Sequence, residues 1–138
     1  MASLTILKGL PASGKTTYAK QLVDISCKRV NKDDLRMMID NGKYSKSNEA
    51  NVHHIMLDIT RHYLARGYHV VWDNTNLNPK ILKEAKKLVK DYEAPIEIVD
   101  FTDVPLETCI ERDKLREVSV GEKVIRDMYN KYIKKDTK

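Results

Sequence analysis

The hydrophobic residues of this chain follow two spacings that alternate from end to end. Short apolar runs, typical of buried parallel strands, lie at residues 4–7, 27–31, 68–73 and 96–101. Between these runs, apolar residues return every three to four positions, which is typical of helices. The alternation predicts a doubly wound α/β fold with three layers, α/β/α, around a parallel sheet of four or five strands.

Two long helices are predicted with clear ends. One is expected to be capped by Ser47 and to stop at Gly67, and the other to open at Asn78 and Pro79. Their apolar faces are formed by Val52, Ile55, Met56, Ile59 and Tyr63, and by Ile81, Leu82, Ala85, Leu88, Val89 and Tyr92. Shorter helices are expected after Pro105 and close to the C-terminus.

The composition is that of one soluble globular domain spanning residues 1–138. The chain is 41% hydrophobic and 33% charged, and no apolar run approaches the ~20 residues of a membrane-spanning helix. The N-terminus lacks a signal-peptide pattern, and Cys27 and Cys109 are too few to predict a disulfide framework or a metal site. We therefore expect a cytosolic protein with reduced cysteines. The Met37-Met38-Ile39 run is predicted to pack in the core.

The formal net charge of +5 suits an anionic partner such as ATP, a nucleotide or a nucleic acid. No long run of like charge forms a basic arm. Ordinary solvated lysines explain the same charge, so composition alone does not identify the partner.

Residues 9–16 fit Gly-x-x-x-x-Gly-Lys-Ser/Thr, the phosphate-binding P-loop. The motif follows a predicted strand and precedes a predicted helix, which is the setting it needs. Lys15 would reach the β- and γ-phosphates of ATP, and the Thr16 hydroxyl would hold Mg²⁺. The nucleotide contacts are expected from Gly9, Pro11, Ala12, Ser13, Gly14, Lys15, Thr16 and Thr17.

Ligands of such sheets sit beyond the carboxyl ends of the strands, so the rest of the site should follow the other three strands. After the second strand, Asp33 is a candidate base for an attacking hydroxyl, and Arg36 lies one helical turn further on, where it could hold an anionic acceptor. The alternative is that Asp33 or Asp34 only caps the following helix.

The third and fourth strands are followed by further candidates. Asp73 ends an apolar strand, as does the acid that orients Mg²⁺ in other P-loop proteins. Arg112 and Arg116 are predicted to share one face of a helix that closes as a lid over the phosphates. The alternative is a solvated, ion-paired helix, because Glu111, Asp113 and Glu117 are interleaved with the arginines.

The order of these motifs is similar to that in one known family. Gly-x-Pro-x-Ser-Gly-Lys-Thr, Asn-Lys-Asp-Asp-Leu-Arg, Asp-Asn-Thr-Asn-Leu-Asn-Pro and Asp-Val-Pro-Leu-Glu with paired arginines occur at residues 9–16, 31–36, 73–79 and 103–116. This set resembles the kinase domain of bacteriophage T4 polynucleotide kinase and its phage and bacterial relatives. The resemblance runs from Leu4 to Tyr132.

The resemblance implies transfer of the γ-phosphate of ATP, with Mg²⁺, to the 5′-hydroxyl of DNA or RNA. By position, Asp33 resembles the general base, Arg36 the residue that grips the 3′-phosphate of the terminal nucleotide, and Arg112 and Arg116 the lid arginines. We further expect a monomer or weak oligomer without membrane contact, in the cytosol of a bacterium or a phage-infected host.

Two departures from the family pattern matter. The phage prototype continues into a 3′-phosphatase domain, which we do not expect here because the sequence stops at Lys138. The family also often has Asp where Asn74 stands, so whether Asp73 or Asn74 faces the metal is left open. Two alternatives to polynucleotide kinase remain: a P-loop kinase of a small molecule such as a nucleoside, a sugar or a zeta-toxin-like acceptor, and a nucleotide-binding switch without phosphoryl transfer.

Overall fold

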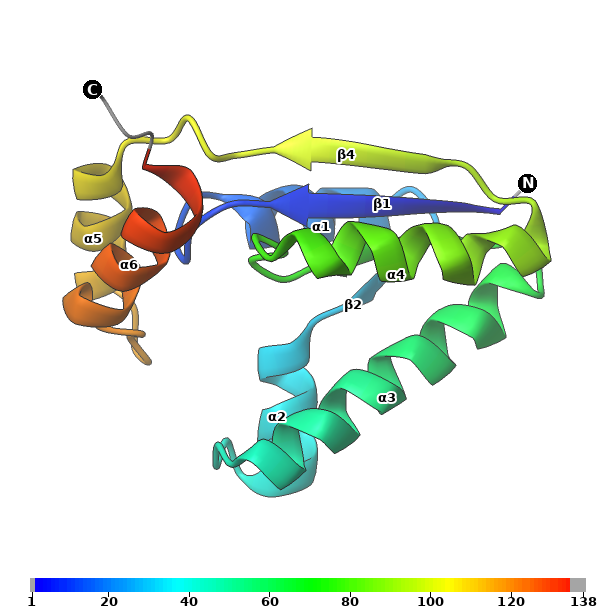
Figure 1. Cartoon of the computed structure of the whole chain (residues 1–138), viewed down its shortest axis with the longest axis horizontal. Helices are drawn as coiled ribbons and strands as arrows, with labels where there is room; N and C mark the ends of the chain where they lie inside the picture. The colour runs from blue at the N-terminus through cyan, green and yellow to red at the C-terminus, as the bar shows by residue number, and fades with distance from the viewer. Residues whose placement is uncertain (1, 135–138) are drawn as a thin grey trace.

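A computed structural model describes residues 2–134 as a parallel sheet with helices on both faces (Figure 1). Residues 1 and 135–138 of the predicted domain lie outside the described residues. The strands are β1 (Ser3–Lys8), β2 (Cys27–Val30), β3 (His69–Asp73) and β4 (Ile96–Asp100), in the spatial order β2-β3-β1-β4. All three neighbouring pairs are parallel. The predicted three-layer fold is confirmed, with four strands in the described part of the chain.

The helices lie between the strands and after them. They are α1 (Lys15–Val23), α2 (Lys32–Asp40), α3 (Lys46–Leu64), α4 (Pro79–Val89), α5 (Leu106–Lys114) and α6 (Glu122–Met128), with short turns η1 (Lys90–Tyr92) and η2 (Tyr129–Ile133). Side chains alternate between the two faces of a strand, and this assigns the helices to layers. On β1, Leu7 packs with α1, whereas Leu4 and Ile6 pack with α3 and α4 on the other face.

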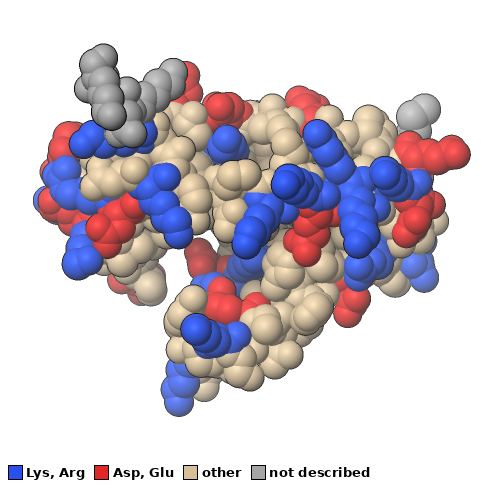
Figure 2. All heavy atoms as spheres, viewed as in Figure 1, with Lys and Arg blue, Asp and Glu red and all other residues tan. Residues whose placement is uncertain are grey.

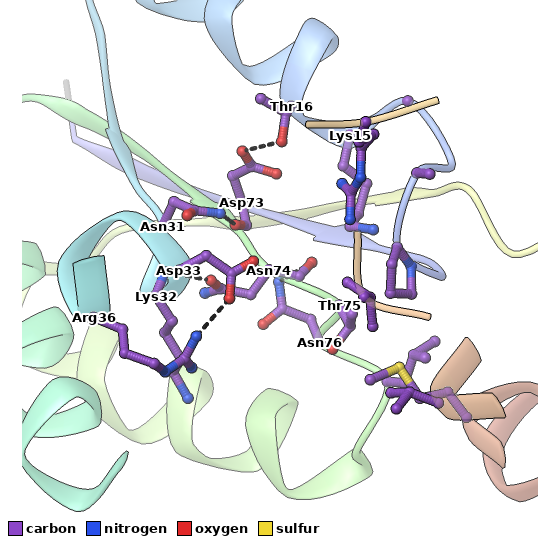
Figure 3. A pocket seen from close by; sticks show the side chains of 18 of the residues that line it. Lys15, Thr16, Asn31, Lys32, Asp33, Arg36, Asp73, Asn74, Thr75 and Asn76 are labelled. Carbon is purple, nitrogen blue, oxygen red and sulfur yellow. Dashed lines mark hydrogen bonds and ion pairs between the residues drawn. The ribbon is translucent and has the colours of Figure 1, made fainter. Parts of the chain in front are cut away.

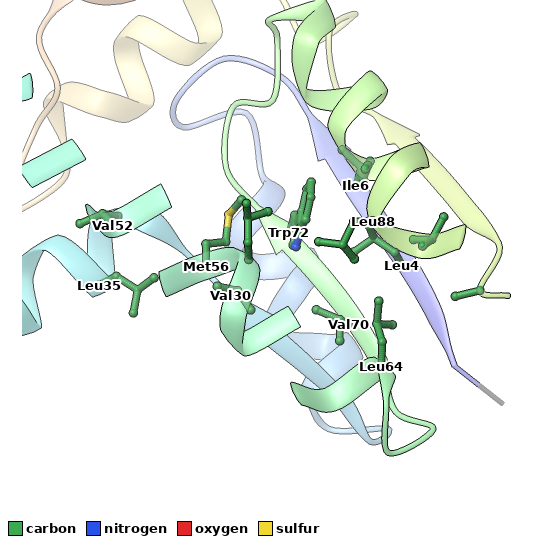
Figure 4. Close-up of a cluster of buried hydrophobic side chains, with 14 residues drawn as sticks. Leu4, Ile6, Val30, Leu35, Val52, Met56, Leu64, Val70, Trp72 and Leu88 are labelled. Atoms are coloured by element: carbon green, nitrogen blue, oxygen red, sulfur yellow. The ribbon is translucent and has the colours of Figure 1, made fainter. Parts of the chain in front are cut away.

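The main core lies between the sheet and α3 and α4 (Figure 4). At its centre is Trp72, which is fully buried and whose indole N–H donates to Thr60 Oγ1 at 2.8 Å. The Thr60 hydroxyl in turn donates to the Met56 carbonyl at 2.7 Å, so each buried polar atom of this group has a partner. The predicted faces of the two long helices are the ones that pack here.

One predicted helix start is wrong. The N-cap of α3 is Ser45, whose extended backbone places its hydroxyl to accept from Asn48 N at 3.0 Å, whereas Ser47 lies within the first turn. Beyond the helix end, Gly67 has φ +83°, a left-handed conformation that suits glycine and lets the chain turn into β3. At α4, Asn78 is the N-cap and Pro79 the first residue, as predicted.

The prediction that Met37, Met38 and Ile39 pack in the core is also wrong. These side chains are exposed on α2, with Met38 75% accessible. The reason is that α2 packs only through one side, where Leu35 joins the main core beside α3. Helical spacing cannot reveal that a helix has only one neighbour.

A separate hydrophobic cluster lies at the carboxyl edge of the sheet. Ile110 of α5 and Ile125 of α6 are buried against Leu10 and Leu77, which belong to the loops after β1 and β3. This packing fixes α5 and α6 beside the P-loop (Figure 1). Within residues 2–134, no helix is long and apolar enough to cross a membrane.

Candidate active site

A cleft of about 1470 Å³ lies at the carboxyl edge of the sheet. It appears as a hollow between two lobes of the surface (Figure 2), and Figure 3 shows the polar side chains that meet in it. The predicted residues that line it are Pro11, Ala12, Gly14, Lys15, Thr16, Thr17, Asp33, Arg36, Asp73, Arg112 and Arg116. Two predicted nucleotide contacts, Gly9 and Ser13, belong to the P-loop but do not line the cleft.

The P-loop backbone has the conformation of an anion cradle. Ala12 and Gly14 have positive φ values of 62° and 107°, which curls the loop ahead of α1. Gly14 is the N-cap of α1 and no side chain caps its first N–H groups, which point toward the cleft end of the helix. Gly9 has a different role: a Cβ there would lie 2.8 Å from Phe101 Cβ, so only glycine allows this approach to the end of β4.

Lys15 lies inside the loop, with 6% of its surface accessible. Its Nζ donates to the carbonyls of Gly9 at 2.9 Å and Leu10 at 2.5 Å, and to Ser13 Oγ at 3.3 Å. Burial lowers the pKa of Lys15 to about 8, although the nearby Asp73 carboxylate opposes the shift. The ammonium is therefore held in place by neutral oxygens that a phosphate could replace.

The carboxylate of Asp73 meets the P-loop helix. Asp73 Oδ2 accepts from Thr16 Oγ1 at 2.9 Å, and Asp73 is only 1% accessible. Asn74 points elsewhere: its Oδ1 accepts from the backbone N–H of Lys32 at 2.8 Å, and its Nδ2 lies 3.3 Å from Met56 Sδ. Asp73, and not Asn74, is thus the side chain that faces Thr16.

Sequence reasoning missed a cation at this position. Arg29 donates through Nε to the same Asp73 oxygen at 2.8 Å and through Nη1 to Asp34 Oδ2 at 2.7 Å. Burial opposes the charge of Arg29, but these two hydrogen bonds outweigh burial and raise its pKa. The strand register contains the missing signal, because Arg29 pairs with Val71, two residues before Asp73 and therefore on the same face of the sheet.

Asp33 and Arg36 lie together in the cleft, close to Asn74 (Figure 3). Arg36 Nη1 donates to Asp33 Oδ1 at 2.7 Å, and the Asp33 side chain is 79% accessible. Neither Asp33 nor Asp34 caps α2, because the cap is Asn31, whose side chain accepts from Asp34 N at 2.8 Å. The capping alternative is therefore wrong.

A second carboxylate, which the motifs did not indicate, holds the other edge of Arg36. Glu49 of α3 accepts from Arg36 Nε at 2.5 Å and Nη2 at 2.7 Å, in the paired geometry that guanidinium and carboxylate groups favour. The hydrogen bonds that Arg36 donates to Glu49 raise its pKa against the effect of burial, and the one to Asp33 adds to this. The same contact with Arg36 lowers the pKa of Glu49. Arg36 is thus oriented from both sides.

Arg112 and Arg116 both line the cleft but do not share a helix face. Helix α5 ends at Lys114, so Arg116 lies in the following loop and the prediction of one helix face is wrong. The cause is Asp113, which accepts from the backbone of Val120 at 3.0 Å and Gly121 at 2.9 Å and from Arg116 Nη2 at 2.8 Å.

Asp113 organises the loop between α5 and α6. It is 2% accessible, which excludes the solvated-helix alternative for this acid. Burial alone would raise the pKa of Asp113, but the two backbone N–H groups and the Arg116 charge lower it. The loop that carries Arg116 is therefore folded around a buried carboxylate, which spacing along the sequence could not predict.

The residues present fit a nucleoside triphosphate and Mg²⁺. The Thr16 hydroxyl and the Asp73 carboxylate are the oxygen donors that Mg²⁺ favours, and they lie beside the phosphate cradle. Within residues 2–134, no group of three or more His, Cys, Asp or Glu side chains could hold a metal ion by itself.

The fold and the cleft define a P-loop kinase domain. The chain belongs to the AAA-domain family, whose family model matches residues 4–134. A protein of Autographa californica nuclear polyhedrosis virus, named as a bifunctional polynucleotide kinase/RNA ligase, is 28% identical over 147 residues, covering 95% of this chain and 21% of the viral protein.

Two solved structures are also similar to this chain. A chain of the Pnkp1/Rnl/Hen1 RNA repair complex superposes with a TM-score of 0.82 at 25% identity, covering 95% of this chain and 44% of that chain. The Mycobacterium tuberculosis APS kinase CysC, solved with AMPPNP and APS, shares the fold, with a TM-score of 0.63 at 22% identity over 83% of this chain and 69% of its own. The chain thus spans less than half the length of its viral and repair-complex relatives. It is related to polynucleotide kinase domains, and membership of the phage T4 group stays a prediction.

Proposed function

We propose that this protein is an ATP-dependent, Mg²⁺-requiring kinase of polynucleotide 5′-hydroxyl ends. The observation that carries the proposal is that an exposed acid–arginine pair, Asp33 and Arg36, shares one cleft with the P-loop and the Thr16–Asp73 pair. Asp33 and Lys15 line the same cleft. An acceptor hydroxyl on Asp33 would therefore be near phosphates bound by the loop.

Each residue has a defined part in this proposal. Lys15 exchanges loop carbonyls for the β- and γ-phosphates, and Asp33 takes the proton of the 5′-hydroxyl as that oxygen attacks the γ-phosphorus in line. The Thr16 and Asp73 oxygens would hold Mg²⁺, which would neutralise phosphate charge when bound. Arg112 and Arg116 stabilise the charge on the transferring group, and ADP leaves.

The acceptor class is supported by the guanidinium of Arg36. Its Nη1 atom faces the exposed Asp33, while Glu49 fixes the rest of the group in a plane. An arginine held in this way presents a geometry suited to a phosphate oxygen, such as the 3′-phosphate next to the reacting nucleotide.

A panel of acceptors tests the proposal. With labelled ATP and Mg²⁺, we expect transfer to a 5′-hydroxyl oligonucleotide and to a nucleoside 3′-monophosphate, and little to the free nucleoside. Transfer to a free nucleoside or a sugar in preference to both would instead favour the small-molecule kinase. Binding of ATP with no transfer to any acceptor would favour the nucleotide-dependent switch.

A further inference from the structure

In α4 and the turn that follows it, every exposed residue from position 80 to position 90 is a lysine. These residues are Lys80, Lys83, Lys86, Lys87 and Lys90, which we call the lysine track. At 100° per residue they fall within an arc of about 120° on the helix, opposite the apolar face that packs on the sheet.

A merely solvated helix in this protein looks different. On α6, exposed bases pair with acids one turn away, as in Glu122–Arg126 and Lys123–Asp127. Among the residues that the structure describes, no ion pair involves a lysine of the track. The acid within α4, Glu84, pairs with His53 of α3 instead, at 2.7 Å. Against the two acids of this stretch, Glu84 and Asp91, the five lysines leave positive charge in excess.

The net charge of the whole molecule is consistent with an excess of positive charge on the track. The net charge is +5, equal to the number of lysines in the track, so the remainder of the chain is formally neutral. Figure 2 shows Lys and Arg gathering over α4, which faces the viewer, and continuing to the edge of the hollow. Lysines thus gather on the helix that starts beside the cleft, where positive charge favours an anionic partner.

The track starts at the cleft. Asn78 and Ile81, at the N-terminal end of α4, are lining residues of the cleft, and the helix then leads away along the sheet. From Asn78 to Lys90 the helix axis covers about 18 Å. A stacked single strand advances about 3.4 Å per nucleotide, so this length corresponds to about five nucleotides.

We propose that the lysine track binds the backbone phosphates of the acceptor strand beyond its reacting end. The inference rests on the proposed function, and it adds a surface that makes the enzyme favour polynucleotides over mononucleotides. Contacts of lysine with phosphate oxygens are independent of sequence, so the track would read length and charge but no bases. Because each contact releases a counterion, its contribution should weaken with salt.

The test compares charge reversals on opposite faces of the sheet. The double variant Lys83→Glu/Lys87→Glu and the single variant Lys87→Glu change the track. Lys20→Glu on α1 is the matched control for the single variant, because α1 covers the other face of the sheet. Lys and Glu have similar helix propensities, so all variants should fold, as melting curves would verify. The probes are a nucleoside 3′-monophosphate and 5′-hydroxyl oligonucleotides of about three, six and twelve nucleotides.

For the wild type we expect KM to fall with acceptor length up to about six nucleotides and then to level off. The double variant should raise KM for the longest acceptor roughly 10-fold and leave kcat and KM for the mononucleotide within about 2-fold. In anisotropy titrations its salt dependence should be shallower by about 1.4 in log–log slope, and Lys20→Glu should match the wild type.

Two results would overturn the inference. One is equal binding of the longest oligonucleotide by the wild type and the double variant. The other is a loss of binding in Lys20→Glu equal to that in Lys87→Glu. The binding titration keeps this test separate from the proposed function. A wild type that binds oligonucleotides through the track but phosphorylates none of them would refute the kinase and leave the surface intact.

Discussion

Thr16 and Asp73, 57 residues apart in the chain, meet at 2.9 Å through the Thr16 hydroxyl and the Asp73 carboxylate. The contact exists because Leu7, two residues before the P-loop, pairs with Asp73 in the parallel register of β1 and β3. The phosphate cradle and the acid that ends β3 are therefore at the same edge of the sheet. The two oxygens define the predicted Mg²⁺ site.

Replacing Asp73 by Asn should weaken the response to Mg²⁺. The amide keeps the shape of the side chain but loses the anionic oxygen that Thr16 and Arg29 share. We expect the Mg²⁺ concentration for half-maximal transfer to rise roughly 10- to 100-fold. Asp100→Asn is the control, because Asp100 ends β4 but does not line the cleft. An unchanged Mg²⁺ titration in Asp73→Asn would exclude Asp73 from the metal site.

Asp33→Asn should separate binding from transfer. Asp33 is highly exposed, so its replacement should cost little stability and leave ATP affinity within about 2-fold. Loss of the base should lower kcat by roughly 10²- to 10⁴-fold. Asp34→Asn is the matched control, since this neighbouring acid pairs with Arg29 and not with Arg36. Turnover near that of the wild type in Asp33→Asn would contradict the assignment of the base.

Arg36→Ala should damage acceptors that carry a 3′-phosphate more than those that lack one. A charge-assisted hydrogen bond is worth about 1.5–3 kcal/mol, so kcat/KM for a nucleoside 3′-monophosphate should fall roughly 10- to 100-fold. The residual rate with a free nucleoside should change much less. An equal loss with both acceptors would show that Arg36 acts elsewhere.

ATP binding should depend on pH through Lys15. Burial lowers its pKa from 10.5 to about 8, so the free protein loses this proton well before an ordinary lysine does. Because phosphate needs the charged form, affinity should fall above about pH 8, by at most one power of ten per pH unit. Protein stability should rise over the same interval, because the unfolded chain then binds more protons than the folded one. Calorimetric titration with ATP at several pH values, with Lys15→Met as control, measures the effect.

Asp113→Asn should destabilise the loop that carries Arg116. The amide can satisfy the N–H groups of Val120 and Gly121 only in part, and the lost charge weakens the Arg116 contact, so we expect a loss of about 2 kcal/mol in the free energy of unfolding. The lowered pKa of Asp113 stabilises the fold above about pH 4, and this contribution is lost as the pH falls through the folded-state pKa. In Asp127→Asn, which loses an exposed ion pair, the change should stay below about 0.5 kcal/mol. Denaturant unfolding of both variants compares them directly.

Periodicity and local motifs were sufficient for the layers, the strands and the P-loop, because each depends on residues close in sequence. Asn78 begins a helix and Gly67 follows the end of another, as their local patterns predict. The contributions of Arg29 and Glu49 were missed because each acts across elements: Arg29 reaches β3, and Glu49 of α3 reaches α2. Register and helix packing decide such contacts, and neither is readable from one sequence.

The errors have the same origin. Arg112 and Arg116 have helical spacing, yet a buried Asp113 ends the helix between them. The Met37-Met38 pair looks like core, yet α2 has a neighbour on one side only. In both cases a tertiary contact overrides a correct local tendency.

The central claim is transfer of the γ-phosphate of ATP to a 5′-hydroxyl. The most direct measurement follows labelled phosphate from ATP, with Mg²⁺, onto an oligonucleotide with a free 5′-hydroxyl and onto the same oligonucleotide with a 5′-deoxy end. We expect label on the first only, at the 5′ end, and labelling that is roughly 10²- to 10⁴-fold slower with Asp33→Asn. Equal labelling of both oligonucleotides, or none of either, would contradict the claim.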